Sequence, residues 1–323
     1  MTPSRPRPPA PLAAAVAVLL ALAAAFLLGS ARSPAADRNG AQELGDPDYG
    51  VCRGTDPRCY HDWGNADPAA GYRVLLYTRT AGPRHGNLGP ALAAGLNPPL
   101  VAANVVQNGV VALGRDNGFA VDWTEDVTRL ASPANLFRYQ AVIFFSTSRD
   151  TLDDAAQTSL RQYLRGGGGF VGVHNAFGTE YNWSWYEGLL GGANYYDHGP
   201  EQNGVVRTAD RRDSSTAALP RRWEFRDEWY NLVPFPSRVR VLATVDESTL
   251  AEGVTGGSGH PGHGANHPVA WCQYYDGGRA WLTTLGHDGG LFAEDSTVPG
   301  AALFRSMLLG GITSAMGREP FCR

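Results

Sequence analysis

Continuous apolar runs alternate with amphipathic stretches along the chain from residue 72 onward. The runs at 73–78, 141–145 and 170–173 are apolar almost throughout, which is typical of strands buried on both faces of a sheet, and 119–123 predicts a further strand. Helices are predicted over 99–115 and from a cap at Thr151 to the glycines that begin at Gly166. Strands that alternate with helices predict a three-layer α/β fold with a mainly parallel sheet.

The second half of the chain favours antiparallel strands. Strands are predicted over 239–244, 268–274 and 279–285, with Asp276-Gly277-Gly278 as the hairpin turn between the last two. A closing helix is predicted over 301–316. We therefore expect one domain over residues 72–316, with antiparallel additions in its second half, followed by a C-terminal tail over 317–323.

Residues 1–36 predict a signal peptide or an N-terminal membrane anchor. An apolar run over residues 12–28 follows two arginines and precedes a small-residue site. The run is long for a signal peptide and just short for a membrane span, so both alternatives remain open. Both place the rest of the chain outside the cytoplasm, either secreted or anchored to the cell membrane.

Residues 37–71 are rich in Asp, Gly, Pro and Asn and predict a linker that contains cysteine. Cys52 and Cys59 bracket a turn-rich stretch and could close a small disulfide loop, as an exported protein allows. Four cysteines allow three pairings, so the partners of Cys272 and Cys322 stay open.

The composition excludes several functions. All 27 basic residues are arginine, so a lysine Schiff base and the lysine of a phosphate-binding loop are both absent. The net charge is −4 and there is no basic tract, which argues against a nucleic-acid partner.

Histidines stand where a parallel α/β sheet usually carries its function, at the carboxyl ends of the strands. His174 directly follows the fourth predicted strand and His85 closes the loop after the first. The turn at His174 resembles a nucleophile elbow with histidine in place of Ser or Cys, which leaves acid–base catalysis, ligand binding or metal ligation.

Further candidates lie beyond this turn. The stretch 179–186 holds four aromatic rings and Glu180, which could bind a sugar, although its tryptophans could equally cover the core. Glu228 could be a general base or could pair with Arg226. The loop that carries His260 and His263 is glycine-rich and is expected to be mobile and exposed.

A metal site is a weaker expectation. In three dimensions, ligands could come from His85, His174, His198, Glu228, His267 and His287. However, the chain has no short ligand spacing such as His-Glu-x-x-His, so we expect no metal cofactor.

Seven short motifs give the chain a family resemblance. They are Thr80–His85, Gly167–His174, Tyr186–Gly192, Asp227–Tyr230, His267–Trp271, Leu285–His287 and Leu308–Ile312. In this order the chain resembles the ThuA-like proteins, a family named for trehalose utilization and related in fold to class I glutamine amidotransferases. The resemblance implies their flavodoxin-like fold and a link to sugar and keto-sugar metabolism. Because His174 replaces the amidotransferase cysteine, glutamine hydrolysis is not expected.

The leading hypothesis is an exported protein that acts on a carbohydrate, such as a keto-sugar or glycoside, through acid–base chemistry at His174 assisted by Glu228 and His85. The expected substrate-binding residues are Thr80, Arg84, Glu180, Tyr181, Trp185, Tyr186, His198, Tyr230, His267 and His287. Two alternatives remain open, a non-catalytic carbohydrate-binding module and a metal-dependent hydrolase.

Overall fold

The computed structural model describes residues 48–64, 68–92, 95 and 97–323. All of these residues belong to one compact unit, Pro47–Arg323. The predicted signal peptide or anchor over residues 1–36, with its apolar run at 12–28, lies outside the described residues. Within the described part, no helix combines the length and the apolar character that crossing a membrane requires.

The first half of the unit builds four strands of the parallel sheet that the apolar runs predicted, and β12 from the second half adds the fifth. Its strands run side by side in the order β3-β2-β4-β5-β12, and every neighbouring pair is parallel. The strands are β2 (Arg73–Tyr77), β3 (Ala120–Thr124), β4 (Ala141–Phe145), β5 (Gly169–Val173) and β12 (Gly278–Thr283). Strands β4 and β5 are buried along their whole length, because helices cover both faces of the sheet.

The second half extends the same sheet with antiparallel strands in the order β12-β11-β10-β7-β8. They are β7 (Gln202–Thr208), β8 (Arg222–Asp227), β10 (Arg240–Asp246) and β11 (His267–Tyr275). The predicted hairpin is confirmed, with Asp276 and Gly277 at φ values of 46° and 93° between β11 and β12. β12 pairs parallel with β5 on one side, so it joins the two halves of the sheet.

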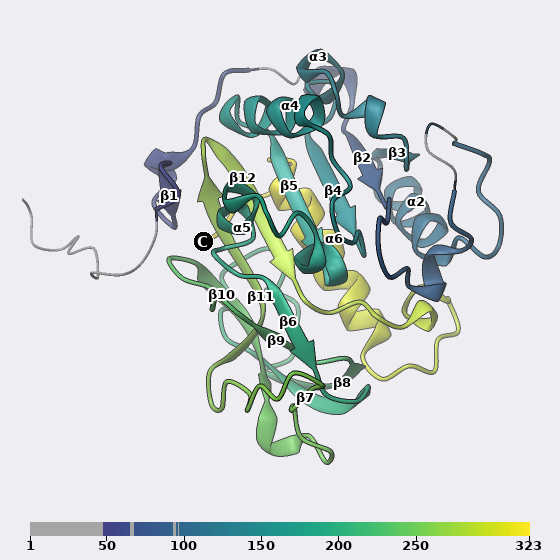
Figure 1. The fold of residues 1–323 in the computed structure, drawn as a ribbon, viewed down its shortest axis with the longest axis vertical. Coiled ribbons are helices and arrows are strands. Elements are labelled where there is room, and N and C mark those ends of the chain that lie inside the picture. Colours follow the sequence, from purple (N-terminus) through teal and green to yellow (C-terminus); the bar gives the residue numbers. More distant parts are fainter. Residues whose placement is uncertain (1–47, 65–67, 93–94, 96) are drawn as a thin grey trace, which may run out of the picture. The chain divides into compact units, whose positions relative to one another are not determined.

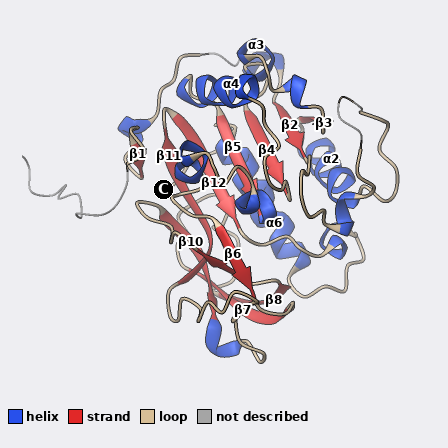
Figure 2. Cartoon of the chain, viewed as in Figure 1, coloured by secondary structure: helices blue, strands red, loops and turns tan. Residues whose placement is uncertain are grey.

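Helices cover both faces of the sheet and complete the three layers (Figures 1 and 2). α2 (Val105–Asn117) and α6 (Ala301–Ala315) contribute to one apolar core, and α3 (Pro133–Leu136), α4 (Asp154–Arg165) and α5 (Ser184–Leu189) to the other. The predicted α/β fold is therefore confirmed.

Two helix starts differ from the prediction. α4 begins after Asp153, whose carboxylate accepts a hydrogen bond of 2.8 Å from the Ala156 amide, so Asp153 and not Thr151 caps the helix. α2 begins at Val105, later than the expected residue 99. The side chain of Asn104 accepts a hydrogen bond from the Val101 amide and holds the preceding residues in a turn.

Small elements complete the unit. A two-stranded ribbon of β6 (Tyr195–His198) and β9 (Tyr230–Leu232) stands apart from the main sheet. Short 3-10 helices connect the larger elements: η2 (Pro57–Cys59), η3 (Pro68–Ala70), η4 (Gly86–Leu88), η5 (Val127–Arg129), η6 (His174–Gly178), η7 (Glu247–Thr249) and η8 (Gly289–Phe292).

Two disulfides crosslink the unit, one within a local loop and one between the sheet and the C-terminal segment. Cys52 pairs with Cys59, as predicted, and Cys272 on β11 pairs with Cys322. Within the predicted linker, β1 (Arg53–Gly54) adds to the main sheet by pairing with β11. The packed unit therefore extends beyond the predicted domain of 72–316 at both ends. Paired cysteines of this kind are typical of an oxidising, extracytoplasmic compartment.

Candidate functional site

The candidate site lies at the carboxyl ends of the parallel strands. β5 ends at Val173, directly before His174, and the loop after β2 carries His85. Four non-glycine residues near this edge have a positive φ: Ser146 (48°), Arg149 (60°), His174 (52°) and Glu180 (52°). Such a conformation costs roughly 1–3 kcal/mol per residue and tends to cluster at functional sites.

The imidazole of His174 is the centre of the site and is fully buried. Its Nδ1 lies 2.9 Å from the carbonyl oxygen of Thr284, which can only accept a hydrogen bond, so Nδ1 carries a proton. Its Nε2 lies 3.0 Å from Nε2 of His85 and 3.0 Å from the hydroxyl oxygen of Tyr230. The imidazole of His174 therefore bridges the loop after β12 and the His85 loop.

Glu228 is the carboxylate of the site. Its Oε2 lies 3.1 Å from Nδ1 of His287, 3.6 Å from Nε2 of His198 and 3.7 Å from Nε2 of His174. The His287 contact is close but lacks the alignment of a hydrogen bond. Three histidines from different parts of the chain therefore contact one carboxylate group.

Burial and neighbouring charges set the protonation of the cluster. Burial is the main cause that holds the pKa of His174 well below its usual value, and it lowers the pKa of His85 to about 4 with help from His287. Burial also disfavours the charged form of His287, but the nearby Glu228 outweighs it and raises the pKa of His287. Burial likewise opposes ionisation of Glu228, yet its contacts with His287 and the other histidines bring the pKa below its usual value. Near neutral pH the cluster therefore holds a carboxylate beside the uncharged imidazoles of His85 and His174.

Asp227 supports this arrangement and was not identified from the sequence. Its buried carboxylate accepts hydrogen bonds from the amides of Glu228 (2.8 Å) and Gly286 (2.7 Å). Burial raises the pKa of Asp227 to about 8. One side chain thus fixes the backbone next to Glu228 and next to His287, and the Asp-Glu pair in the sequence was the only signal of it.

A cleft of about 280 Å³ opens beside the cluster. Its walls are formed by Pro83, His85, Ser148, Arg149, Asn175, Gly178, Tyr181, Tyr195, His198, Glu228 and Tyr230. Five of these, His85, Tyr181, His198, Glu228 and Tyr230, were predicted to belong to the site. Ser148, Arg149, Asn175 and Tyr195 were missed, although Ser148 and Asn175 follow predicted strands closely. His287 does not line this cleft. It lines a second hollow of about 290 Å³, which shares His85 with the cleft.

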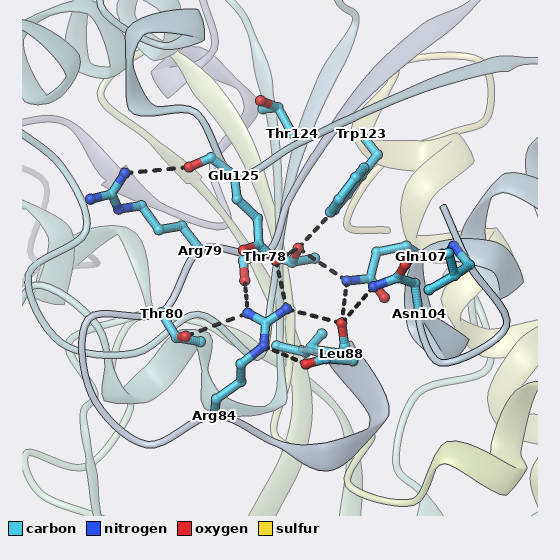
Figure 3. A network of polar contacts seen from close by, with 12 residues as sticks. Thr78, Arg79, Thr80, Arg84, Leu88, Asn104, Gln107, Trp123, Thr124 and Glu125 are labelled. Carbon is cyan, nitrogen blue, oxygen red and sulfur yellow. Dashed lines mark hydrogen bonds and ion pairs between the residues drawn. The ribbon is translucent and has the colours of Figure 1, made fainter. Parts of the chain in front are cut away.

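Arg84 and Thr80, which were expected to bind substrate, belong to a polar network that holds the His85 loop (Figure 3). The Arg84 guanidinium forms a buried ion pair of 2.8 Å with Glu125 and donates to the carbonyl oxygens of Leu88 and Gly89. Thr80 contacts the same guanidinium at 3.4 Å. Arg84 therefore positions its neighbour His85.

Four further predicted residues lie outside the cleft with structural partners. The Glu180 carboxylate accepts hydrogen bonds from the amides of Thr151 (2.7 Å) and Leu152 (2.9 Å), ahead of α4. Trp185 donates a hydrogen bond to Asp276, and Tyr186 donates one to the Ala176 carbonyl. His267 contacts Glu247 and the Tyr230 carbonyl. All four side chains are buried with these partners and do not face the cleft.

The glycine-rich loop with His260 and His263 is exposed at residues 257–259, 261 and 264, as expected, but its two histidines make specific contacts. Nε2 of His263 accepts a hydrogen bond of 3.0 Å from the Leu232 amide, and both histidines are half-buried. The Glu247 carboxylate accepts from the His263 amide at 2.6 Å. The loop is therefore packed against β9.

A further cavity of about 160 Å³ lies at the opposite, amino end of the strands, beside Gly166–Gly168 and Arg279. Tyrosines dominate its lining, which includes no histidine and only Asp62 as a carboxylate. It lacks the acid–base groups of the cleft, so we place the site at the cleft.

Comparisons with known proteins agree with the fold. The ThuA family model, described as trehalose utilisation, matches residues 73–313. Solved structures of ThuA-like proteins from Bacteroides uniformis and Parabacteroides merdae are similar, with TM-scores of 0.56 and 0.55 and sequence identities of 19% and 17%. The matches cover 75% and 77% of this chain and 91% of each of those chains. At these identities the likeness concerns the fold alone. No curated protein matches the sequence.

Proposed function

Since this chain belongs to the ThuA family, we propose that it is an exported protein that acts on a carbohydrate in the cleft beside His85. One observation carries the proposal: a cluster of histidines around the Glu228 carboxylate opens into a cleft lined by tyrosines and polar side chains. The family description, trehalose utilisation, supports a sugar as the ligand.

The lining of the cleft suits a sugar. Tyr181 and Tyr195 offer aromatic rings for the C–H surface of a sugar ring, while Asn175 and Ser148 offer polar groups for its hydroxyls. The Arg149 guanidinium lies 5.3 Å from the Tyr181 ring centroid and forms no ion pair with a carboxylate of the described chain. It can therefore donate hydrogen bonds to a carbonyl or hydroxyl oxygen of the ligand.

Glu228 is the group best placed to accept a proton from the ligand. It lines the cleft, and a glutamate is ionised near neutral pH. In a keto-sugar, the C–H bond next to the carbonyl would break, its proton would pass to Glu228, and its electron pair would form an enolate. In a keto-glycoside with a suitably placed leaving group, the enolate would then collapse, break the glycosidic C–O bond and release the alcohol after protonation of its oxygen.

His174 has a different role in this proposal from the one that its sequence position suggested. Its imidazole is fully buried and does not line the cleft. We therefore assign His174 as a positioning residue, because it contacts His85 and Tyr230 from the buried side. His85 and Glu228 line the cleft and would face the ligand.

The two disulfides and the N-terminal sequence support an extracytoplasmic location. We propose export through residues 1–36, with the apolar run at 12–28 acting as a cleaved signal peptide or as an anchor. Cell fractionation followed by N-terminal sequencing of the mature protein separates the two forms. Full-length chain that is soluble in the cytosol would contradict export.

The proposed function is tested by calorimetric binding and turnover assays with sugars and 3-keto-sugars. Glu228→Gln keeps the shape of the side chain but removes the base, so turnover should fall by about 10² to 10⁴ while binding persists. Glu224→Gln, a change at an exposed carboxylate on β8, is the matched control and should behave as the parent does. Binding without turnover by the parent would establish the non-catalytic alternative, and no binding of any sugar would refute the proposal.

A further inference from the structure

Four side chains of the site converge on one place. His85, His174, His287 and Glu228 each offer one ligand-type atom there, and these atoms all lie within 4.8 Å of one another. We propose that the four residues form a binding site for one divalent transition-metal ion, for which zinc is the best fit.

The spacing of the atoms suits a tetrahedral ion. Two ligands at the usual zinc distance of about 2.0–2.1 Å and at a tetrahedral angle lie about 3.3 Å apart. Three contacts in the cluster bracket this value: His85 to His174 at 3.0 Å, His287 to Glu228 at 3.1 Å, and His174 to Glu228 at 3.7 Å. Small side-chain adjustments would therefore place all four atoms around one ion.

The tautomer of His174 leaves its Nε2 free to bind a metal ion. Because its Nδ1 donates to the Thr284 carbonyl, Nε2 of the uncharged ring carries the lone pair. A backbone carbonyl that holds the far nitrogen is the usual outer partner of a metal-binding histidine. His85 and Tyr230 both lie 3.0 Å from this single lone pair, and only one of them can donate to it well.

Hydrogen bonding alone does not account for His287. Its Nδ1, the atom that faces Glu228, is buried and has no hydrogen-bond partner among the described residues. Buried polar atoms of this kind are rare, and an ion at the centre of the cluster would draw the imidazole of His287 to it. The close contact of His287 with Glu228 would then be that of two ligands of one ion.

The second histidine cluster of the protein provides a contrast. There, Nε2 of His263 accepts from the Leu232 amide, and Nδ1 of His260 accepts from the Gly262 amide. Both ring nitrogens of His267 also have partners, Glu247 and the Tyr230 carbonyl. Each histidine of that cluster therefore has a hydrogen-bonded ring nitrogen, whereas Nδ1 of His287 in the site cluster is buried without a hydrogen-bond partner among the described residues.

The ligand set indicates the class of metal. Three imidazoles and one carboxylate suit zinc and its first-row neighbours, whereas magnesium and calcium prefer oxygen ligands throughout. Asp227 would act as a further outer group, since its carboxylate fixes the backbone amide of Glu228 and that of Gly286, next to His287. Such outer partners orient the ligands and tune the affinity.

The consequence of the ion for catalysis rests on the proposed function. If the carbonyl oxygen of a sugar in the adjoining cleft joined the ion as a fifth ligand, zinc would polarise that carbonyl and make the neighbouring C–H more acidic. The contacts of Glu228 with the three histidines all run through Oε2. A carboxylate bound to the ion through Oε2 would keep Oε1 to accept the proton.

Metal binding is tested on the full chain, stripped with a chelator and titrated with zinc chloride by calorimetry, with bound metal measured by elemental analysis. One equivalent should bind. His85→Ala and His287→Ala should each weaken binding by at least about 100-fold, because even the loss of an outer partner weakens binding 10- to 100-fold. His61→Ala, which removes an imidazole outside the cluster whose Nδ1 contacts the Arg165 carbonyl, should retain the parent affinity.

Titration with cobalt(II) adds a spectroscopic readout. A four-coordinate site should give intense visible absorption in the parent and in His61→Ala, and should lose it in the double variant His85→Ala/His287→Ala. Circular dichroism in the presence of chelator establishes that each variant is folded. No stoichiometric binding by the parent, or undiminished binding by the folded double variant, would overturn the metal site. Neither result depends on a sugar, so failure of the carbohydrate proposal remains distinguishable.

Discussion

His85 and His174 bring their Nε2 atoms to within 3.0 Å of each other, although 89 positions separate them in the chain. One lies on the loop after β2 and the other directly after β5, and β4 lies between these two strands in the sheet. The pair therefore forms only when the His85 loop reaches across the end of β4. The geometry of the site therefore depends on the contacts that hold the His85 loop, such as those of Arg84.

The first prediction concerns this loop. Arg84→Ala leaves the buried Glu125 carboxylate without its guanidinium, so we expect a loss of about 3–5 kcal/mol in the free energy of unfolding. Arg115→Ala removes an exposed pair with Asp116 and should cost less than about 1 kcal/mol. Urea unfolding curves of both variants measure the difference, and equal losses would contradict a structural role for Arg84.

The second prediction links metal to stability. Zinc chloride added to the stripped protein at about 100 times the dissociation constant should stabilise the folded state by about 2.7 kcal/mol. For a unit of this size the melting temperature should rise by roughly 5–10 °C. The rise should disappear in His287→Ala and persist in His61→Ala, as measured by differential scanning fluorimetry.

The third prediction separates Glu180 from the reaction. Glu180→Ala leaves the buried amides of Thr151 and Leu152 unpaired, which should cost about 1–3 kcal/mol of stability. Because Glu180 does not line the cleft, the KM and kcat of any sugar turnover should stay near the parent values. Glu252→Ala, at an exposed position, is the control for stability. A raised KM with unchanged stability would return Glu180 to the substrate site.

The fourth prediction compares the two disulfides. Chain-entropy arguments give about 4 kcal/mol for the Cys272–Cys322 pair, which is separated by 50 positions, and about 2.5 kcal/mol for Cys52–Cys59, separated by 7. Serine replacement of each pair should therefore lower the free energy of unfolding in that order. Guanidinium unfolding of the two double variants tests it, and the reverse order would contradict it.

The sequence predicts the parallel half of the fold well, because burial on both faces leaves apolar runs such as 141–145 that few other structures produce. It predicts the far edge poorly. β8, for example, alternates exposed and buried positions over Arg222–Asp227, so that Trp223 and Phe225 point inward between charged neighbours. This period of two was present in the sequence but is short, and charged residues dominate it.

The sequence also predicts some residues of the candidate site correctly and misplaces others. His85, His174 and Glu228 were expected to lie together because strand ends meet at one edge, and the structure brings them together. Glu180 was placed in the substrate site by its aromatic neighbours alone. Its actual partners, the amides of Thr151 and Leu152, lie 28 to 29 positions earlier and leave no local signal. The buried Nδ1 of His287 that lacks a hydrogen-bond partner is likewise visible only in the three-dimensional structure.

Strand β11 holds the segments at both ends of the packed unit: β1 pairs with its last residues, and Cys322 is bonded to its Cys272. A force that pulls either segment outward would therefore act on β11, which is hydrogen-bonded to β10 and β12 on its two sides. Neither segment could detach without breaking a contact with this strand. An exopeptidase that works along the chain towards β11 from its carboxyl side would meet a crosslink at Cys322. This arrangement provides mechanical and proteolytic durability.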